Sequence, residues 1–289
     1  YGVGSFSVPE APKPFAANGK SRPAPARGEK LNLDRRRSSA NVNQSGQTMV
    51  EFAAEKRALE EQRKAEEAAA ALLLAEQMAK EIVNSIIKPN MSEFDKALAI
   101  HDWLIFNLDY DFTYSNYYVE QALTDRRCVC QGYALTFKMM CEMAGLNVIY
   151  VTGEGYSGGA WGGHAWNQVR IDGVWYNVDV TWDDPTNDTS GKVYHYNFLR
   201  STEGIKETGH KYGVFDRTDF ITTPKSTKYD NYFWQDSGTA FQLLNDKIYY
   251  IDSDYVSESK EHKTGKLTEL DDINDTTPVV LKEITDEWK

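Results

Sequence analysis

Three residues have the types and positions that thiol chemistry requires: Cys130, His164 and Asp179. Cys130 stands shortly before an almost wholly apolar run, Ala134 to Ala144, which ends at Gly145. This run predicts a buried helix that Gly145 caps at its C-terminal end. Cys130 would then lie at or just before the first turn, where free backbone N–H groups and the positive end of the helix dipole favour a thiolate. The same N–H groups could hold a developing oxyanion.

His164 and Asp179 lie on two predicted strands, His164 to Ile171 and Val174 to Thr181. The dipeptide Asp172-Gly173 joins them, and Asp-Gly between two such runs is typical of a two-residue hairpin turn. Asp179 stands between two valines in an otherwise apolar strand, which is an unusual place for an unpaired carboxylate.

The predicted turn also decides which side chains share a face of this hairpin. It pairs His164 with Thr181 and Trp166 with Asp179. His164, Trp166 and Asp179 then project from the same side, and the side chains of His164 and Asp179 can meet diagonally. A carboxylate in this position can bind one imidazole nitrogen and leave the other for a thiol.

A cysteine at a helix start, with a His–Asp pair on neighbouring strands, indicates a nucleophile, a general base and an orienting acid. The histidine would deprotonate Cys130, the thiolate would attack an amide or acyl carbonyl, and the acyl-enzyme would pass to water or to an amine. Each residue taken alone has a structural alternative. Cys130 could be a packed thiol, His164 a hydrogen-bonded strand residue, and Asp179 a surface charge or a turn cap.

The other cysteines and histidines are less well placed for chemistry. Cys128 lies two residues before Cys130, outside the predicted helix, and Cys141 lies among methionines as a core residue would. Three cysteines are too few, and odd in number, for a disulfide scaffold, and the spacing of Cys128 and Cys130 fits neither a zinc knuckle nor a redox pair. His195 is a minor site candidate. The other histidines, His101, His210 and His262, show no metal-ligand spacing. We therefore predict no metal, and we predict no cofactor.

Six glycines between Gly153 and Gly163 follow a predicted strand at Leu146 to Thr152. They predict either an ordinary flexible connection or a loop that lines the substrate. A phosphate loop is excluded, because no Gly-Lys-Ser/Thr sequence follows and no helix begins there.

Three motifs resemble the core motifs of bacterial transglutaminase-like domains. They are VCQGYA (Val129–Ala134), GHAWNQV (Gly163–Val169) and WYNVDVTWDDP (Trp175–Pro185). The stretch from Lys80 to Leu104 is also similar to the lead-in helices of those proteins. The resemblance covers about residues 80 to 200, under half of the chain.

This resemblance implies an α+β, papain-like fold in which a helix bearing the cysteine packs on an antiparallel sheet bearing the histidine and the aspartate. It assigns Cys130 as the nucleophile, His164 as the base and Asp179 as the orienting acid. The family includes protein crosslinkers, cysteine proteases, amidases and catalytically inactive binding versions.

Several aromatic and polar residues are expected to contact the substrate. Gln131, Tyr118 and Trp166 are candidates for the side-chain oxyanion donor, and Trp161, Trp166 and Tyr156 would line an aromatic cleft. We therefore predict thiol-dependent acyl transfer on peptide or protein amides, with hydrolysis and transamidation both open. The alternative is a catalytically inactive module of the same family that binds peptide or glycan at the cell surface.

The chain divides by composition into four predicted parts. Residues 1–46 hold five of the nine prolines and predict a flexible tail, whereas residues 47–88 have strong helix composition and predict a long charged helix. Residues 89–223 are the predicted catalytic core, in which Tyr194 to Phe198 resembles a further strand. Residues 224–289 predict a small β-rich appendage.

Shorter patterns refine these parts. Ser92 to Asp95 resembles a capping box, which would open a helix at the start of the core. In the appendage, Tyr232 to Trp234, Ala240 to Leu244 and Lys247 to Asp252 are typical of short strands. The closing residues, from Glu269 onwards, are polar and acidic and are expected to fray.

The net charge excludes one class of partner. The 289 residues carry 32 basic and 43 acidic side chains, for a net charge of −11. Residues 1–46 hold eight basic and three acidic residues, a net charge of +5, so the rest of the chain carries a net charge of −16. An acidic folded part argues against nucleic-acid binding. The longest apolar run, Ala68 to Ala75, is far shorter than the roughly 20 residues that span a bilayer.

The expected partner is therefore a peptide or protein substrate. The chain begins at Tyr1 without a methionine, which predicts a fragment or a processed product. Its modular layout and low cysteine content favour a secreted or cell-envelope protein, for which an envelope component could be the substrate. A cytoplasmic location and the oligomeric state stay open.

Overall fold

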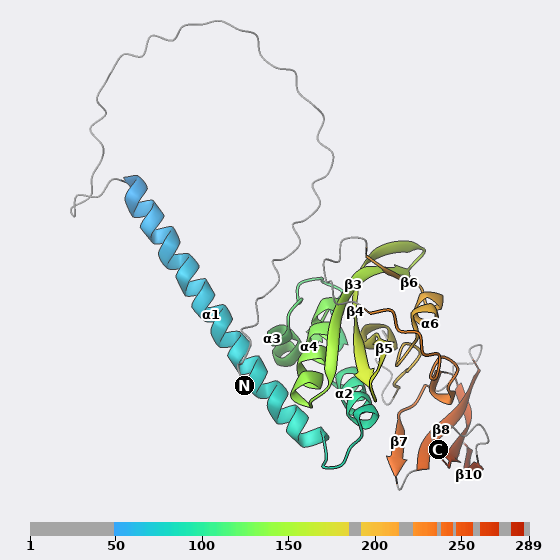
Figure 1. Cartoon of the computed structure of the whole chain (residues 1–289). Coiled ribbons are helices and arrows are strands. Elements are labelled where there is room, and N and C mark those ends of the chain that lie inside the picture. Colours follow the sequence, from blue (N-terminus) through green and yellow to red (C-terminus); the bar gives the residue numbers. More distant parts are fainter. Residues whose placement is uncertain are drawn as a thin grey trace, which may run out of the picture. The chain divides into compact units, whose positions relative to one another are not determined.

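The computed structural model describes residues 49–184, 192–213, 222–235, 238–244, 247–256, 261–271 and 279–285 (Figure 1). By their internal contacts the residues fall into two units, Tyr1–Arg57 and Ala58–Lys289. The predicted tail, residues 1–46, lies outside the described residues. Within the described part, no helix combines the length and the apolar character that a membrane span needs.

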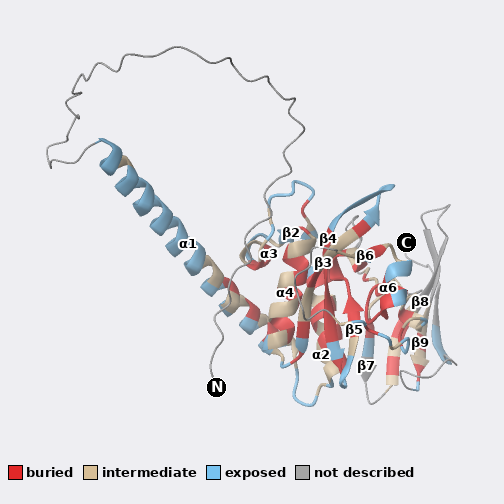
Figure 2. Cartoon of the chain, turned by 45° about the horizontal axis from the view of Figure 1, so that its top comes forward, coloured by how far each residue is buried: buried red, intermediate tan, exposed pale blue. Residues whose placement is uncertain are grey.

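The long helix predicted at residues 47–88 is α1, Met49–Ile86. Its residues 58–70 are exposed on every face, as their charged composition predicts. Ala75, Ala79 and Val83 are buried at intervals of four residues, which is the spacing of one helix face (Figure 2). The second half of α1 therefore joins the core of the second unit through small side chains.

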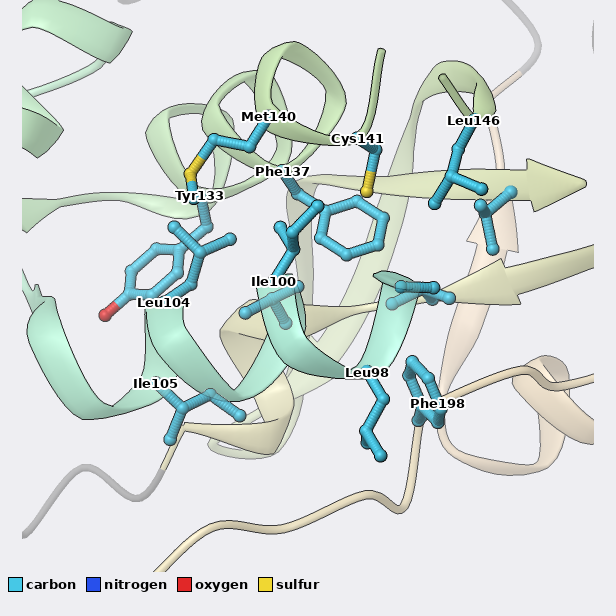
Figure 3. Packing of buried hydrophobic residues seen from close by; sticks show 14 of the residues in the cluster. Leu98, Ile100, Leu104, Ile105, Tyr133, Phe137, Met140, Cys141, Leu146 and Phe198 are labelled. Atoms are coloured by element: carbon cyan, nitrogen blue, oxygen red, sulfur yellow. The ribbon is translucent and has the colours of Figure 1, made fainter. Parts of the chain in front are cut away.

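The core of this unit begins with α2, Glu93–Asn107, which opens at the predicted capping box. Ser92 Oγ accepts the backbone N–H of Asp95 at 3.1 Å, and the Asp95 carboxylate accepts the N–H of Ser92 at 3.0 Å. The buried face of α2 packs on α4, Cys130–Met143. Figure 3 shows apolar side chains meeting between these helices, among them Ile100 and Leu104 of α2 and Tyr133 and Phe137 of α4.

A four-stranded antiparallel sheet, in the order β5-β4-β3-β6, packs against α4. Its strands are β3 (Asn147–Ser157), β4 (Ala160–Ile171), β5 (Val174–Val178) and β6 (His210–Tyr212). The turn predicted at Asp172-Gly173 joins β4 to β5 and pairs Ile171 with Val174, as expected. The predicted α+β class, with a cysteine-bearing helix on an antiparallel sheet, is confirmed.

The glycine-rich segment is a β-hairpin, and the expectation of a loop was wrong. β3 and β4 pair without interruption as far as Ser157 and Ala160, across a turn of two glycines with positive φ. A Cβ on Gly153 would lie 2.6 Å from the ring of Trp166, and a Cβ on Gly155 would lie 2.6 Å from the ring of Trp182. Gly153 and Gly155 thus leave space for large rings.

The second strand of the Asp-Gly hairpin is shorter than predicted. β5 ends at Val178, and Asp179 is the N-cap residue of a short helix, α5 (Val180–Asp183). The Asp179 carboxylate accepts the N–H groups of Thr181 and Trp182 at 3.0 and 3.4 Å, which turns the chain into that helix. The predicted strand pairings of Thr181 and of Asp179 therefore do not form.

Residues 194–198 do not form the predicted strand. Their backbone is held by Asp183 instead, since its carboxylate accepts the N–H of Asn197 at 2.9 Å and its carbonyl accepts the N–H of Tyr194 at 3.2 Å. The sheet is extended by β6, which follows the short helix α6 (Thr202–Glu207) and pairs with β3.

The C-terminal residues form a second antiparallel sheet, in the order β10-β9-β8-β7. The strands are β7 (Phe241–Leu244), β8 (Lys247–Val256), β9 (Glu261–Leu270) and β10 (Val279–Thr285), so the expectation of a frayed end was wrong for β10. The strand predicted at 232–234 is instead a 3-10 turn, Phe233–Gln235, which buries Trp234 in a stack on Phe241 at 5.3 Å.

Candidate active site

Cys130 is the first residue of α4. The N-cap residue, Val129, has no side-chain acceptor, so its side chain leaves the first N–H groups of the helix uncapped. Gly132 in the same turn is required by a close contact, because a Cβ there would lie 2.4 Å from the Cβ of Cys128. Cys128 is buried under this turn, and burial raises the pKa of its thiol above the usual range. Cys130, in contrast, lines a cleft.

A short parallel strand pair leads into α4. It joins β1 (Asp109–Tyr110) to β2 (Arg127–Cys128), with α3 (Val119–Asp125) between them in sequence. The pairing sets Tyr110 in register with Cys128, two residues before Cys130. The loop after β1 is therefore anchored beside the start of α4.

Asp111 fixes the conformation of that loop. Its carboxylate accepts the hydroxyl of Thr113 and the backbone N–H groups of Thr113, Ser115 and Asn116, the last three at 2.8 to 2.9 Å. These hydrogen bonds hold the pKa of Asp111 well below its usual range.

His164 and Asp179 are joined by a short hydrogen bond. Nε2 of His164, on β4, lies 2.6 Å from Oδ2 of Asp179, and both side chains are buried. Burial disfavours the charged imidazole, but the Asp179 carboxylate and then the Cys130 thiol outweigh it and raise the pKa of His164 to about 10. Burial alone would raise the pKa of Asp179, yet His164 and a second histidine, His210, hold it well below its usual range.

Two tryptophans enclose this pair. Both stack on the ring of His164, Trp182 at a centroid distance of 4.8 Å and an interplanar angle of 29°, and Trp166 at 6.0 Å and 23°. Gly155 permits this arrangement, because its missing side chain leaves the space that the Trp182 ring occupies. Aromatic faces stabilise a cation, so the arrangement favours an imidazolium at His164.

A cleft of about 690 Å³ contains Cys130 and His164 together. Its rim is aromatic and exposed, with Phe112 and Tyr114 from the loop after β1, Tyr156 and Trp161 from the β3–β4 hairpin, and Tyr196. Asp184, Thr181 and Asn197 add polar groups to its lining.

Of the five residues predicted to contact substrate, Tyr156 and Trp161 line this cleft. Trp166 is buried and donates its indole N–H to Asn177 at 3.4 Å, so this donor is directed away from an incoming carbonyl. Gln131 and Tyr118 are only partly buried and are not among the residues that line the cleft.

Tyr110 lines the cleft and was not singled out from the sequence. Burial, and then the Cys130 thiol, raise the pKa of its hydroxyl above the usual range. Among the described residues, none forms a hydrogen bond with this hydroxyl. The pairing of the two-residue strands β1 and β2 places Tyr110 in the cleft. Strands this short leave no recognisable pattern in the sequence.

His101, Asp102, His195 and Asp183 form a buried hydrogen-bonded cluster outside the cleft. Asp102 accepts from His101 at 2.9 Å and from His195 at 2.8 Å, and His101 also bonds Asp183 at 3.1 Å. Burial disfavours the charged form of His101, but the carboxylates of Asp102 and Asp183 outweigh it and raise the pKa of His101 to about 9. His195, the minor site candidate, thus lies in this cluster.

Among the residues that the structure describes, two groups could offer three ligand atoms to a metal ion: His101, Asp102 and His195, and His164, Asp179 and His210. In both, the carboxylate oxygen lies 2.6 to 2.9 Å from the ring nitrogens. Ligand atoms around a tetrahedral zinc ion stand about 3.3 Å apart, since zinc–ligand distances are about 2.0 Å. The observed spacings are those of direct hydrogen bonds, and we assign no metal to either group.

Comparison with known proteins places this geometry in a family context. Residues 80–180 match the model of the transglutaminase-like superfamily, which confirms the resemblance of the three motifs. Kyphoscoliosis peptidase of Mus musculus is 30% identical over 132 residues, which is 40% of this chain and 20% of the relative. The same protein of Homo sapiens is 30% identical over 125 residues, 38% of this chain and 19% of the relative. The chain thus spans about a fifth of the length of these relatives.

A solved structure described as a TGase aligns with 41% of this chain and 34% of its own, at 19% identity and a TM-score of 0.36.

Proposed function

We propose that the transglutaminase-like segment at residues 80–180 performs thiol-dependent acyl transfer on peptide or protein amides. The observation that supports this most is the 2.6 Å hydrogen bond between His164 and Asp179, in a cleft that also holds Cys130 at a helix start. Nucleophile, base and orienting acid are thereby available to one substrate carbonyl.

The hydrogen bond decides which imidazole nitrogen does the chemistry. Nε2 of His164 is bound to Asp179, so Nδ1 is the atom that takes the proton of the Cys130 thiol. The thiolate attacks the amide carbonyl, and the tetrahedral intermediate collapses as Nδ1 returns the proton to the leaving amine. This leaves a thioester between Cys130 and the acyl group.

The second half of the reaction repeats these steps with a new nucleophile. Water or a primary amine gives a proton to Nδ1 of His164 and attacks the thioester carbonyl. The sulfur leaves as a thiolate, and the product is an acid or a new amide. Hydrolysis and transamidation therefore share the same residues and differ in which nucleophile reaches the acyl-enzyme.

Two groups are suited to stabilise the oxyanion of each intermediate. One is the uncapped first turn of α4, whose N–H groups and dipole favour negative charge. The other is the hydroxyl of Tyr110, which lines the cleft close to Cys130. We assign Tyr110 the role that was expected of Gln131, Tyr118 or Trp166.

The test is an assay with glutamine-containing donor peptides, with and without a primary amine. Incorporation of the amine identifies a transferase, and release of ammonia or cleaved peptide alone identifies a hydrolase. Cys130→Ala is the control and should abolish both products. If neither product forms but peptide or glycan binds at the aromatic rim, the chain is an inactive binding module.

A further inference from the structure

The carboxylate of Asp179 is shared by two histidines. Its Oδ2 atom lies 2.6 Å from Nε2 of His164 and 2.8 Å from Nε2 of His210. His210 is the first residue of β6, and its side chain is fully buried. The acyl-transfer steps described above do not use this second histidine.

Both ring nitrogens of His210 face hydrogen-bond acceptors. Nδ1 lies 3.1 Å from the carbonyl oxygen of Ile205 and 3.1 Å from Oγ1 of Thr208. A carbonyl oxygen can only accept, so the contact with Ile205 requires an N–H at Nδ1. Nδ1 therefore carries a proton. Nε2 carries the second, because the group it faces is the ionised carboxylate of Asp179.

The surroundings of the His210 ring suit a cation. The titratable groups in described contact with it are Asp179 and His164, whose ring centroid is 5.4 Å away. The rings of Trp182 and Trp166 contact it at centroid distances of 4.3 and 5.2 Å. A buried cation needs a counter-charge, and the Asp179 carboxylate supplies it.

We infer that His210, as an imidazolium, is a positioning residue that neutralises Asp179 and so sets the protonation balance of the Cys130–His164 pair. The inference rests on the proposed function. With His210 charged, the site holds two cations, His210 and His164, and two anions, Asp179 and the Cys130 thiolate. Without the charge on His210, one positive charge fewer would stabilise the Cys130 thiolate.

The size of this effect follows from the distance. One unit charge at the 5.4 Å between the two rings, at an effective dielectric constant of about 20, corresponds to about two pH units at His164. Asp179 and His210 lie at Nε2 of that ring and Cys130 is served by Nδ1, so about two units is the upper limit for the thiol. Solvent and relaxation reduce this, so a displacement of about one to two units is expected.

The test is the pH dependence of Cys130 alkylation by iodoacetamide in the full chain, mapped by mass spectrometry. His210→Gln keeps an N–H donor for Asp179 and removes the charge. Lys211→Gln is the matched control, because it removes a positive charge at the next position, where Lys211 is exposed and pairs with Glu154 at 2.8 Å. The acid limb is the range of pH over which the alkylation rate of Cys130 rises. Its midpoint should move to higher pH by about one to two units in His210→Gln and by less than about 0.3 units in Lys211→Gln.

An unchanged acid limb in folded His210→Gln would overturn the inference and leave the proposed function intact. If Cys130 of the unmodified chain reacts no faster than a small free thiol, the proposed function fails and the inference with it. If circular dichroism shows that His210→Gln is unfolded, Thr208→Val takes its place. This substitution is isosteric and removes one hydrogen-bond partner of Nδ1 of His210. Its acid limb should move in the same direction, and no movement would again overturn the inference.

Discussion

Nε2 of His164 lies 2.6 Å from Oδ2 of Asp179, slightly shorter than the roughly 2.7–2.9 Å of an N–H···O hydrogen bond between charged partners. The other oxygen of Asp179 accepts the backbone N–H groups of Thr181 and Trp182 at 3.0 and 3.4 Å. The carboxylate is therefore fixed by the chain that follows it, and it fixes the orientation of the imidazole in turn. The geometry of the proposed active site therefore depends on this carboxylate.

Asp179→Asn should lower kcat by about 10²- to 10⁴-fold in the acyl-transfer assay. The amide has one acceptor oxygen, so it cannot serve both the histidines and the two backbone N–H groups. The tautomer of His164 is then no longer enforced. Near-UV circular dichroism checks that the variant is folded, and a folded variant within about threefold of the unmodified rate would contradict this role.

Tyr110→Phe should lower kcat by about 10- to 10³-fold and change KM little. The substitution removes the hydroxyl and keeps the ring that lines the cleft, so a donor to the oxyanion is lost while ground-state contacts stay. Tyr114→Phe is the matched control, since Tyr114 also lines the cleft but is exposed at its rim. Equal effects of the two substitutions on kcat would refute a specific role for Tyr110.

Gly155→Ala should destabilise the fold by roughly 1–3 kcal/mol, because the new Cβ would lie 2.6 Å from Trp182 and 3.2 Å from the His164 ring. Gly162→Ala, on the paired strand β4, is the control, since nothing lies within 4 Å of a Cβ at that position. The readout is the free energy of unfolding in urea. Equal losses for both variants would show that the tryptophan contact is not what requires glycine.

The His101 cluster predicts a loss of stability at high pH. The pKa of His101 is raised to about 9 in the folded chain, from an ordinary value of 6.5. Protonated His101 therefore contributes up to about 3 kcal/mol to the free energy of unfolding. This contribution is complete below pH 6.5 and is lost as the pH rises through 9. His101→Gln should flatten the fall in unfolding free energy between pH 6.5 and 9. A slope equal to that of the unmodified chain would rule out this contribution.

Local signals allowed much of the fold to be predicted. The capping box at Ser92, the start of a helix at Cys130 and the Asp172-Gly173 turn each depend on a few adjacent residues. The glycine-rich hairpin was missed because the reason for its glycines is distant in sequence. Gly155 makes room for Trp182, a ring that only the folded chain brings there.

In the candidate site, too, residues with a local sequence signal were predicted, and residues placed by distant parts of the chain were not. Cys130, His164 and Asp179 could be singled out because each stands in a recognisable element or motif. His210 and Tyr110 could not, since His210 reaches Asp179 through β6 and Tyr110 reaches the cleft through the register of β1 with β2. Trp166 was expected on the substrate face, but its indole N–H is taken by Asn177.

The most direct test of the account is the selectivity of alkylation among the three cysteines near neutral pH. Cys128 and Cys141 are buried, and burial raises the pKa of both thiols, whereas Cys130 lines the cleft beside His164. Brief treatment with iodoacetamide should label Cys130 rapidly and selectively, and His164→Ala should remove that rapid reaction. Slow and equal labelling of all three thiols, unaffected by His164→Ala, would contradict a catalytic Cys130.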